Sequence, residues 1–206
     1  MPSSAGNPGF GFPAASPHRG RLIVISGPSG AGKGTLIGRV LPRLKDTSLS
    51  RSATTRPRRP DEVQGREYFF LTSGEFEQRV KQGDFIEHVN YGSNSYGTLR
   101  SEVEKELAAG RNVILEIELV GARNVKRQMP EAVLFFIAPP DFEELARRLK
   151  GRGTEADTEI AARLERAREE LASQHEFDYI IVNRTVDQAA ADLLTAIQSA
   201  LEGGRT

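Results

Sequence analysis

Four short apolar runs, separated by longer amphipathic stretches, form the main hydrophobic pattern of the chain. They lie near residues 22, 113, 134 and 180 and are rich in Ile, Val and Leu. Such runs are typical of fully buried strands, whereas apolar residues that repeat every three or four positions are typical of helices. Buried strands that alternate with helices predict a parallel sheet covered on both faces, and therefore an α/β fold.

The same patterns predict the individual elements. Strands are expected at residues 22–25, 49–53, 68–71, 85–91, 112–117, 132–137 and 179–182. Helices are expected at residues 34–44, 73–82, 99–107, 120–129, 142–149, 160–171 and 186–201. Between about residues 50 and 98 the strands are short, partly polar and joined by turn signals. We therefore expect a small mixed subdomain inserted beside the core sheet.

The first apolar run leads into a glycine-rich turn and then a helical pattern, all within the sequence LIVISGPSGAGKGTL. This order of elements is what a phosphate-binding loop (P-loop) requires. Gly27, Gly30 and Gly32 allow consecutive backbone N–H groups to converge on a phosphate at a helix N-terminus. Lys33 adds a positive charge, and the hydroxyl of Thr35 would hold Mg²⁺ directly or through water. An ordinary glycine turn is the alternative.

Composition excludes several classes of protein. The chain has 206 residues, with 28 Lys and Arg against 28 Asp and Glu, which does not suggest a general binder of nucleic acid or membrane surfaces. It has no cysteine, which fits a reducing cytoplasm, and no apolar run as long as a membrane span. Residues 1–20 are rich in Pro, Gly, Ser and Ala, so we expect a disordered extension there and no signal peptide.

A basic loop is the first candidate site outside the P-loop. The sequence SRSATTRPRRP, at residues 50–60, groups Arg56, Arg58 and Arg59 with hydroxyl side chains, and its prolines forbid a regular element. Arginine forks match phosphate oxygens in pairs, and the hydroxyls of Tyr68 and Tyr96 would add neutral donors. These groups are what a second phosphate site needs, but this stretch taken alone favours the alternative, a solvated basic loop with ordinary proline turns.

Carboxylates form the second candidate site. Glu116 and Glu118 follow the apolar strand expected at residues 112–117, at the carboxyl edge of the sheet where open α/β folds bind ligands. One carboxylate would oppose Mg²⁺. Another, or Glu87, would accept hydrogen bonds from a base with two N–H donors on its pairing edge, as guanine has. Solvated charges at a strand end are the alternative.

Arginines around the turn GRGT form the third candidate site. Arg147, Arg148 and Arg163 lie on or beside the helices expected on either side of this turn, and Arg152 lies in the turn itself. On a mobile helical flap they would neutralise a phosphoryl group during transfer and exclude water. The alternative is that they are ordinary exposed charges paired with neighbouring glutamates.

The complete set of motifs resembles one family. The segments SGPSGAGKGT, SATTRPRRPDEVQGREYFF, FIEH, SYGT, ILEIELVGA, FIAPP, GRGTE and IIVN, in this order, resemble guanylate kinases among the nucleoside-monophosphate kinases. The resemblance implies a P-loop NTPase core (residues 21–49, 99–140 and 172–206), an inserted GMP-binding part (50–98) and a helical lid (141–171). It also implies transfer of the ATP γ-phosphoryl group to GMP, and to dGMP, with Mg²⁺.

The resemblance assigns residues to each part of this reaction. The ATP-binding residues are Gly27, Pro28, Ser29, Gly30, Ala31, Gly32, Lys33, Gly34, Thr35 and Asn183. The GMP-binding residues are Ser52, Arg56, Arg59, Tyr68, Glu87, Tyr96, Thr98 and Glu118. The catalytic residues are Lys33, Arg148, Arg152 and Arg163, and the Mg²⁺ ligands are Thr35 and Glu116. The sequence departs from the family at Glu116 and Glu118, where Asp-x-Asp is common, and at Thr98, where serine is frequent.

Two other functions share many of these features. A kinase for AMP, UMP or a phosphorylated sugar would have the P-loop and lid without the acidic base-reading residues. A non-catalytic module that binds protein partners would have the same fold, but such modules typically lose the P-loop lysine or the lid arginines, and both are present here. We therefore expect an enzyme whose partners are its small-molecule substrates ATP and GMP. The sequence does not indicate an oligomeric state.

Overall fold

The computed structural model describes residues 18–150 and 157–203, and a parallel sheet of five strands forms its centre. In sheet order the strands are β2 (Thr47–Leu49), β7 (Asn112–Glu116), β1 (Leu22–Ser26), β8 (Val133–Ala138) and β9 (Tyr179–Val182). All four neighbouring pairs are parallel. The predicted parallel α/β core is therefore confirmed. The extension expected at residues 1–20 falls almost entirely outside the described ranges.

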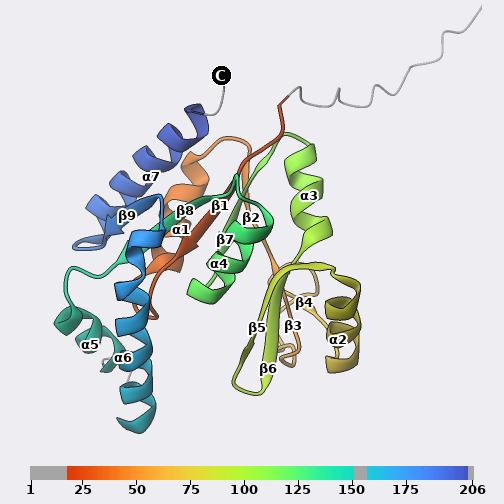
Figure 1. Cartoon of the computed structure of the whole chain (residues 1–206), viewed down its shortest axis with the longest axis horizontal. Coiled ribbons are helices and arrows are strands. Elements are labelled where there is room, and N and C mark those ends of the chain that lie inside the picture. The colour runs from red at the N-terminus through yellow and green to blue at the C-terminus, as the bar shows by residue number, and fades with distance from the viewer. Residues whose placement is uncertain (1–17, 151–156, 204–206) are drawn as a thin grey trace, which may run out of the picture.

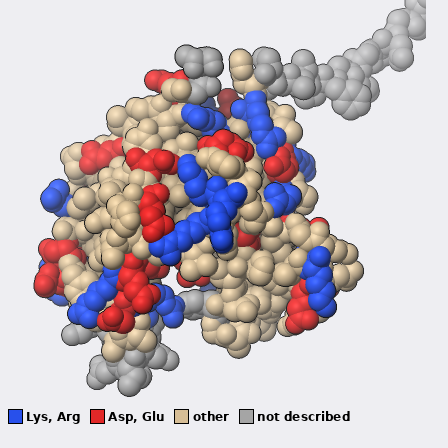
Figure 2. Space-filling view, in the orientation of Figure 1, with Lys and Arg blue, Asp and Glu red and all other residues tan. Residues whose placement is uncertain are grey.

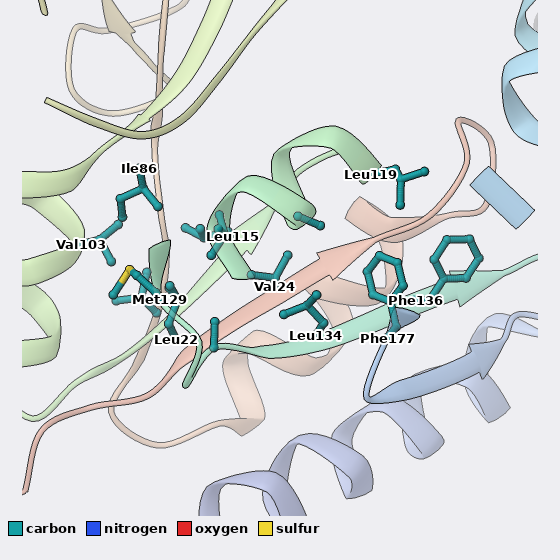
Figure 3. Close-up of a cluster of buried hydrophobic side chains, with 14 of the residues drawn as sticks. Leu22, Val24, Ile86, Val103, Leu115, Leu119, Met129, Leu134, Phe136 and Phe177 are labelled. Atoms are coloured by element: carbon teal, nitrogen blue, oxygen red, sulfur yellow. The ribbon is translucent and has the colours of Figure 1, made fainter. Parts of the chain in front are cut away.

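Helices cover both faces of this sheet, as Figure 1 shows. The core helices are α1 (Lys33–Val40), the short η1 (Leu41–Arg43), α3 (Arg100–Ala108), α4 (Leu119–Gln128), the short η2 (Gln174–Glu176) and α7 (Val186–Glu202). Alternate residues of β1 point to opposite faces, because successive side chains of a strand do so. Leu22 and Val24 pack with α3 and α4, in the cluster drawn in Figure 3. Ile23 and Ile25 pack with α1 and α7.

The segment between β2 and α3 forms a second sheet with its own small core. Its strand order is β4 (Phe69–Phe70), β3 (Ser52–Thr54), β6 (Asn94–Leu99) and β5 (Phe85–Tyr91), and α2 (Ser73–Gln82) packs on it. Ala53, Phe76, Phe85 and Leu99 are buried between them. This is the inserted mixed subdomain that the sequence predicted. Ile86 of β5 instead enters the main core beside Val103 (Figure 3), which anchors the insertion to the core.

Two strands of this region differ from the sequence expectation. The single strand expected at residues 49–53 is wrong, because β2 ends at Leu49 and β3 begins at Ser52 in the other sheet. No Gly or Pro marks the change of sheet, so hydrophobic pattern alone does not detect it. Strand β6 was not expected at all. Its buried residues include Gly97 and Thr98, which give no apolar alternation.

Two helices extend from the core on the side opposite the insertion in Figure 1. They are α5 (Phe142–Lys150) and α6 (Asp157–Ala172), and the turn between them lies outside the described residues. Leu145 and Leu149 of α5 pack against Ala167 of α6 in a separate apolar cluster. The helix pair therefore has a small core of its own.

Charges of both signs are interspersed over the face shown in Figure 2. Basic side chains gather over α4, where Arg123 forms an ion pair with Glu176 and Lys126 with Asp178. In the described part of the chain, no helix is both long enough and apolar enough to cross a membrane.

Candidate active site

The P-loop connects the end of β1 to the start of α1, and its three glycines Gly27, Gly30 and Gly32 all have a positive φ. Gly27 has φ of 140°, and a Cβ atom there would lie 2.3 Å from the carbonyl oxygen of Ile137. Gly32 has φ of 93°, and a Cβ atom there would lie 2.6 Å from Nδ2 of Asn183. Both conformations are ones that side chains rarely adopt. The loop is therefore shaped by the neighbouring strands as well as by its own sequence.

Asn183 supports the P-loop from the end of β9. Its side chain is 3% exposed, and Nδ2 donates a hydrogen bond of 2.7 Å to the carbonyl oxygen of Ala31. Its backbone N–H donates to the carbonyl oxygen of Ala138 at 2.7 Å, which continues the pairing of β8 and β9. The structure thus places this predicted ATP-side residue against the loop backbone, where its amide holds one turn of the loop.

Lys33 is the first residue of α1, and its ammonium group lies inside the P-loop. Its Nζ donates hydrogen bonds to the carbonyl oxygens of Gly27 at 2.5 Å and Pro28 at 3.3 Å. Burial lowers the pKa of Lys33, whereas the charges of Glu116, Glu170 and Glu118 raise it. The loop carbonyls hold the ammonium group inside the loop, from where it could turn to contact a bound phosphate.

Glu116 ends β7 beside the start of α1. Its two carboxylate oxygens lie 3.6 Å from the position that a Cβ atom of Gly34 would occupy. Solvent reaches the side chain, but the surrounding protein raises the pKa of Glu116 and the charge of Lys33 lowers it. Thr35 is exposed on the first turn of α1. The two predicted Mg²⁺ ligands therefore belong to adjoining elements at the carboxyl edge of the sheet.

A cavity of about 370 Å³ lies between the core sheet and the insertion. Its lining residues come from both sheets and the segments that follow them: Ser52, Tyr68, Glu87, Tyr96, Glu116, Ile117 and Glu118. Five of the predicted GMP-side residues are therefore brought to one cavity, together with the predicted Mg²⁺ ligand Glu116. The cavity is large enough for a small ligand.

Glu87 is a buried carboxylate in the wall of this cavity. It is 5% exposed, and Oε1 accepts a hydrogen bond of 2.7 Å from the hydroxyl of Thr98, which is itself 1% exposed. Burial raises the pKa of Glu87, the hydrogen bond from Thr98 lowers it, and the charge of Glu118 raises it. The pairing of β5 with β6 changes register between Phe85 and Glu87. This irregularity lets Ile86 enter the main core while Glu87 reaches the cavity.

The basic loop is organised by an acidic residue that the sequence analysis missed. Glu62 accepts two hydrogen bonds from the guanidinium of Arg56, at 2.7 and 3.0 Å, and one from the backbone N–H of Arg59 at 2.8 Å. These bonds hold the pKa of Glu62 at about 2. The Arg56 guanidinium also lies over the ring of Tyr68, 5.4 Å from its centroid. An irregular loop has no periodicity from which the partner of Arg56 could have been identified.

Two predicted lid arginines contact the P-loop or its support. Arg163 of α6 donates a hydrogen bond of 2.5 Å to the hydroxyl of Ser29. Arg148 of α5 donates to Glu144 at 2.7 Å and to the carbonyl oxygen of Asn183 at 3.2 Å. Arg147 pairs with Glu144 as an ordinary helix-surface charge. Arg152, the third predicted catalytic arginine, lies outside the described residues.

Glu170 of α6 is a second carboxylate that sequence reasoning missed. It is 8% exposed, and burial raises its pKa while the charge of Lys33 lowers it. Its position in a helix rich in Glu and Arg gave no sign that its charge interacts with that of the P-loop lysine. Helix α6 therefore brings charges of both signs to the P-loop region.

Comparisons with known proteins agree on one family. The family model described as guanylate kinase matches residues 19–200. A guanylate kinase of Synechococcus sp. (strain CC9902) is 51% identical over 181 residues, which cover 88% of this chain and 97% of that protein. A guanylate kinase of Frankia casuarinae is 52% identical over 173 residues, covering 84% and 94%. The crystal structure of guanylate kinase from Anaplasma phagocytophilum is similar with a TM-score of 0.70 and 29% identity, covering 89% of this chain and 87% of that one.

Proposed function

The chain belongs to the guanylate kinase family, and we propose that it transfers the γ-phosphoryl group of ATP to GMP, and also to dGMP, with Mg²⁺. The observation that carries this proposal is the shared cavity, which joins a buried carboxylate of the insertion to the carboxyl edge of the core sheet beside the P-loop. One substrate would occupy the cavity and the other the loop. Their reacting groups would then meet near Glu116.

The buried carboxylate supports guanine as the base. Guanine presents an N–H and an amino group side by side, and the two oxygens of Glu87 are acceptors. Oε1 also accepts from Thr98, which fixes the plane of the carboxylate. Glu118 lines the same cavity and would accept a further bond. Adenine lacks two adjacent donors on that edge, so this arrangement would disfavour AMP.

Two tyrosines of the cavity wall and the basic loop next to Tyr68 support binding of a monophosphate. Arg56 and Arg59 lie on one loop, and Tyr68 and Tyr96 have ring centroids 6.3 Å apart beside it. Guanidinium and phenol groups together suit phosphate oxygens. Ser52 lies in the same lining. We assign the role of GMP-binding part to residues 50–98.

The P-loop supports binding of the second nucleotide. Residues 27–35 and Asn183 would hold ATP, with the loop backbone and Lys33 at its phosphates. Among the described residues, no three His, Cys, Asp or Glu side chains are grouped so that they could hold a metal by themselves. Thr35 and Glu116 fit Mg²⁺ as partial ligands, since this ion usually keeps several waters and phosphate oxygens. When bound, Mg²⁺ would neutralise charge on the transferring group.

Positioning and charge neutralisation would supply the catalysis, and no covalent intermediate is needed. Arg148 and Arg163, which already reach the loop region, would contact the phosphates together with Arg152. We assign the role of lid to residues 141–171, and the remaining residues from 21 onward form the core. Nucleoside monophosphates and ATP are cytoplasmic metabolites, so we place the activity in the cytoplasm.

The test is ADP release from ATP and Mg²⁺ with GMP, dGMP, AMP, UMP or CMP as the acceptor. We expect strong turnover with GMP and dGMP only. Turnover with another acceptor would leave a kinase but overturn the reading of Glu87 and Glu118. Folded protein that binds GMP without any turnover would instead favour a binding module.

A further inference from the structure

We propose that Gly121 is a positioning residue for guanine recognition, because the absence of a side chain there gives the carboxylate of Glu87 its place. This inference rests on the proposed function. Gly121 is the third residue of α4, and Glu87 belongs to β5 of the insertion. The contact therefore joins the core to the inserted part at the base-reading residue.

The distances leave no room for a side chain. A Cβ atom at Gly121 would lie 2.9 Å from Oε2 of Glu87 and 3.4 Å from its Cδ atom. On the other side it would lie 3.4 Å from Cβ of Ile117. A contact of 2.9 Å between a methyl carbon and an oxygen is well inside normal packing distance. Either the helix or the carboxylate would have to move.

The carboxylate is the part that would move. Gly121 is buried in α4, which packs on the main core through Leu119, Ala122 and Val125. The backbone of Glu87 is held by its pairing with Thr98 in β6. The side chain of Glu87 is flexible by comparison, and a rotation would turn Oε2 away from the cavity or break the bond from Thr98. The cost would fall on base recognition and leave the fold largely intact.

The helix backbone gives no competing reason for glycine at this position. Gly121 does not have the positive φ that Gly27, Gly30 and Gly32 have. Alanine is a better helix former than glycine, so local stability would favour it here. Gly38 of α1 makes the contrast clear, because a Cβ atom there would meet nothing within 4 Å. Gly38→Ala is therefore a matched control with the same change in composition and no new contact.

The experiment compares wild type, Gly121→Ala and Gly38→Ala. For each protein we would measure GMP binding by calorimetry, kcat and KM with GMP and with inosine monophosphate, KM for ATP, and the thermal unfolding midpoint. Inosine monophosphate lacks the amino group of guanine and so reports the second hydrogen bond separately. Wild-type turnover with GMP tests the proposed function by itself, whatever the variants do.

We expect Gly121→Ala to raise Kd and KM for GMP about tenfold or more, as loss of one hydrogen bond to a charged group does. The ratio of kcat/KM for GMP to that for inosine monophosphate should decrease. KM for ATP should stay the same, and the thermal unfolding midpoint should not fall. Gly38→Ala should match wild type in GMP use. Active wild type together with unchanged GMP binding in Gly121→Ala would overturn the inference and leave the proposed function standing.

A double-mutant cycle with Glu87→Ala tests the contact itself. Once the carboxylate is removed, Gly121→Ala should cause no further loss of GMP affinity. An equal loss in both backgrounds would contradict the proposal. If Gly121→Ala alone does not fold, recovery of the fold in the double variant supports the same contact, and failure to recover contradicts it.

Discussion

The P-loop and the corner that we propose for base recognition, formed by Glu87, Thr98 and Gly121, are built in opposite ways. The loop is nine consecutive residues, 27–35, whose backbone and one lysine would face a phosphate. The corner gathers Glu87 from β5, Thr98 from β6 and Gly121 from α4, so it exists only once the insertion is packed on the core. A backbone site recognises what all nucleotides share, whereas a side-chain site can distinguish one base from another. Substitutions in the two regions should therefore fail differently.

The largest effect is expected for Lys33→Met, which removes the charge from the loop and keeps most of the side-chain length. We expect kcat to fall about a thousandfold, because a charge aimed at the developing phosphoryl group is lost. The fold should persist, because burial disfavours the charged form of Lys33, whereas methionine is an apolar side chain of similar length. Initial rates and thermal unfolding of the purified variant check both statements. Wild-type rates would contradict the assignment of the loop.

An intermediate effect is expected for Glu87→Gln. The amide keeps one acceptor oxygen and adds a donor, so kcat/KM for GMP should fall about tenfold to a hundredfold while KM for ATP stays constant. The preference for GMP over AMP should narrow. Glu77→Gln, at an exposed position of α2, is the matched control. An unchanged preference in Glu87→Gln would refute the role of this carboxylate.

The pH profile sharpens the same assignment. Burial raises the pKa of Glu87. As pH falls, the carboxylate that would accept the hydrogen bonds of guanine should therefore become protonated at a higher pH than an ordinary glutamate does. In wild type, kcat/KM for GMP should therefore decline as pH falls into that region, and in Glu87→Gln this inflection should be missing. The effect of this group on stability has the opposite sign, because the folded chain binds the proton more tightly than the unfolded chain does. The free energy of unfolding that Glu87 contributes is therefore largest at low pH and decreases as pH rises through its pKa in the folded protein.

The smallest effect is expected for Glu62→Gln, which weakens the clamp on Arg56. KM for GMP should rise about fivefold with little change in kcat, because the guanidinium would be less well oriented. The pKa of Glu62 is lowered from 4.5 to about 2, so its stabilisation is complete above pH 4.5 and is lost as pH falls towards 2. Thermal unfolding midpoints of wild type and variant should therefore differ at pH 7 and converge as pH falls through about 2. A difference that stays constant over this range would contradict the clamp.

The sequence predicted the contiguous parts of this molecule well. Strand, glycine turn and helix follow one another in the P-loop, and local pattern was sufficient to identify them. It failed where two distant segments decide a structure. The change of sheet between Leu49 and Ser52, the buried polar strand β6 and the register change at Ile86 all depend on partners far along the chain. Glu170 was missed for the same reason, since Lys33 is far from it along the chain. Glu62 lies near Arg56 in the sequence, but the irregular loop that joins them has no periodicity from which their pairing could be predicted.

The insertion leaves and rejoins the core through strands that are neighbours, because Ser52 of β3 pairs with Thr98 of β6. A segment whose two ends lie side by side can be replaced by another insertion without moving the strands of the core. Glu87 belongs to the insertion, and Lys33 belongs to the core. Replacing this segment would therefore remove Glu87, whereas Gly121 and Glu118 belong to the core and would stay in place.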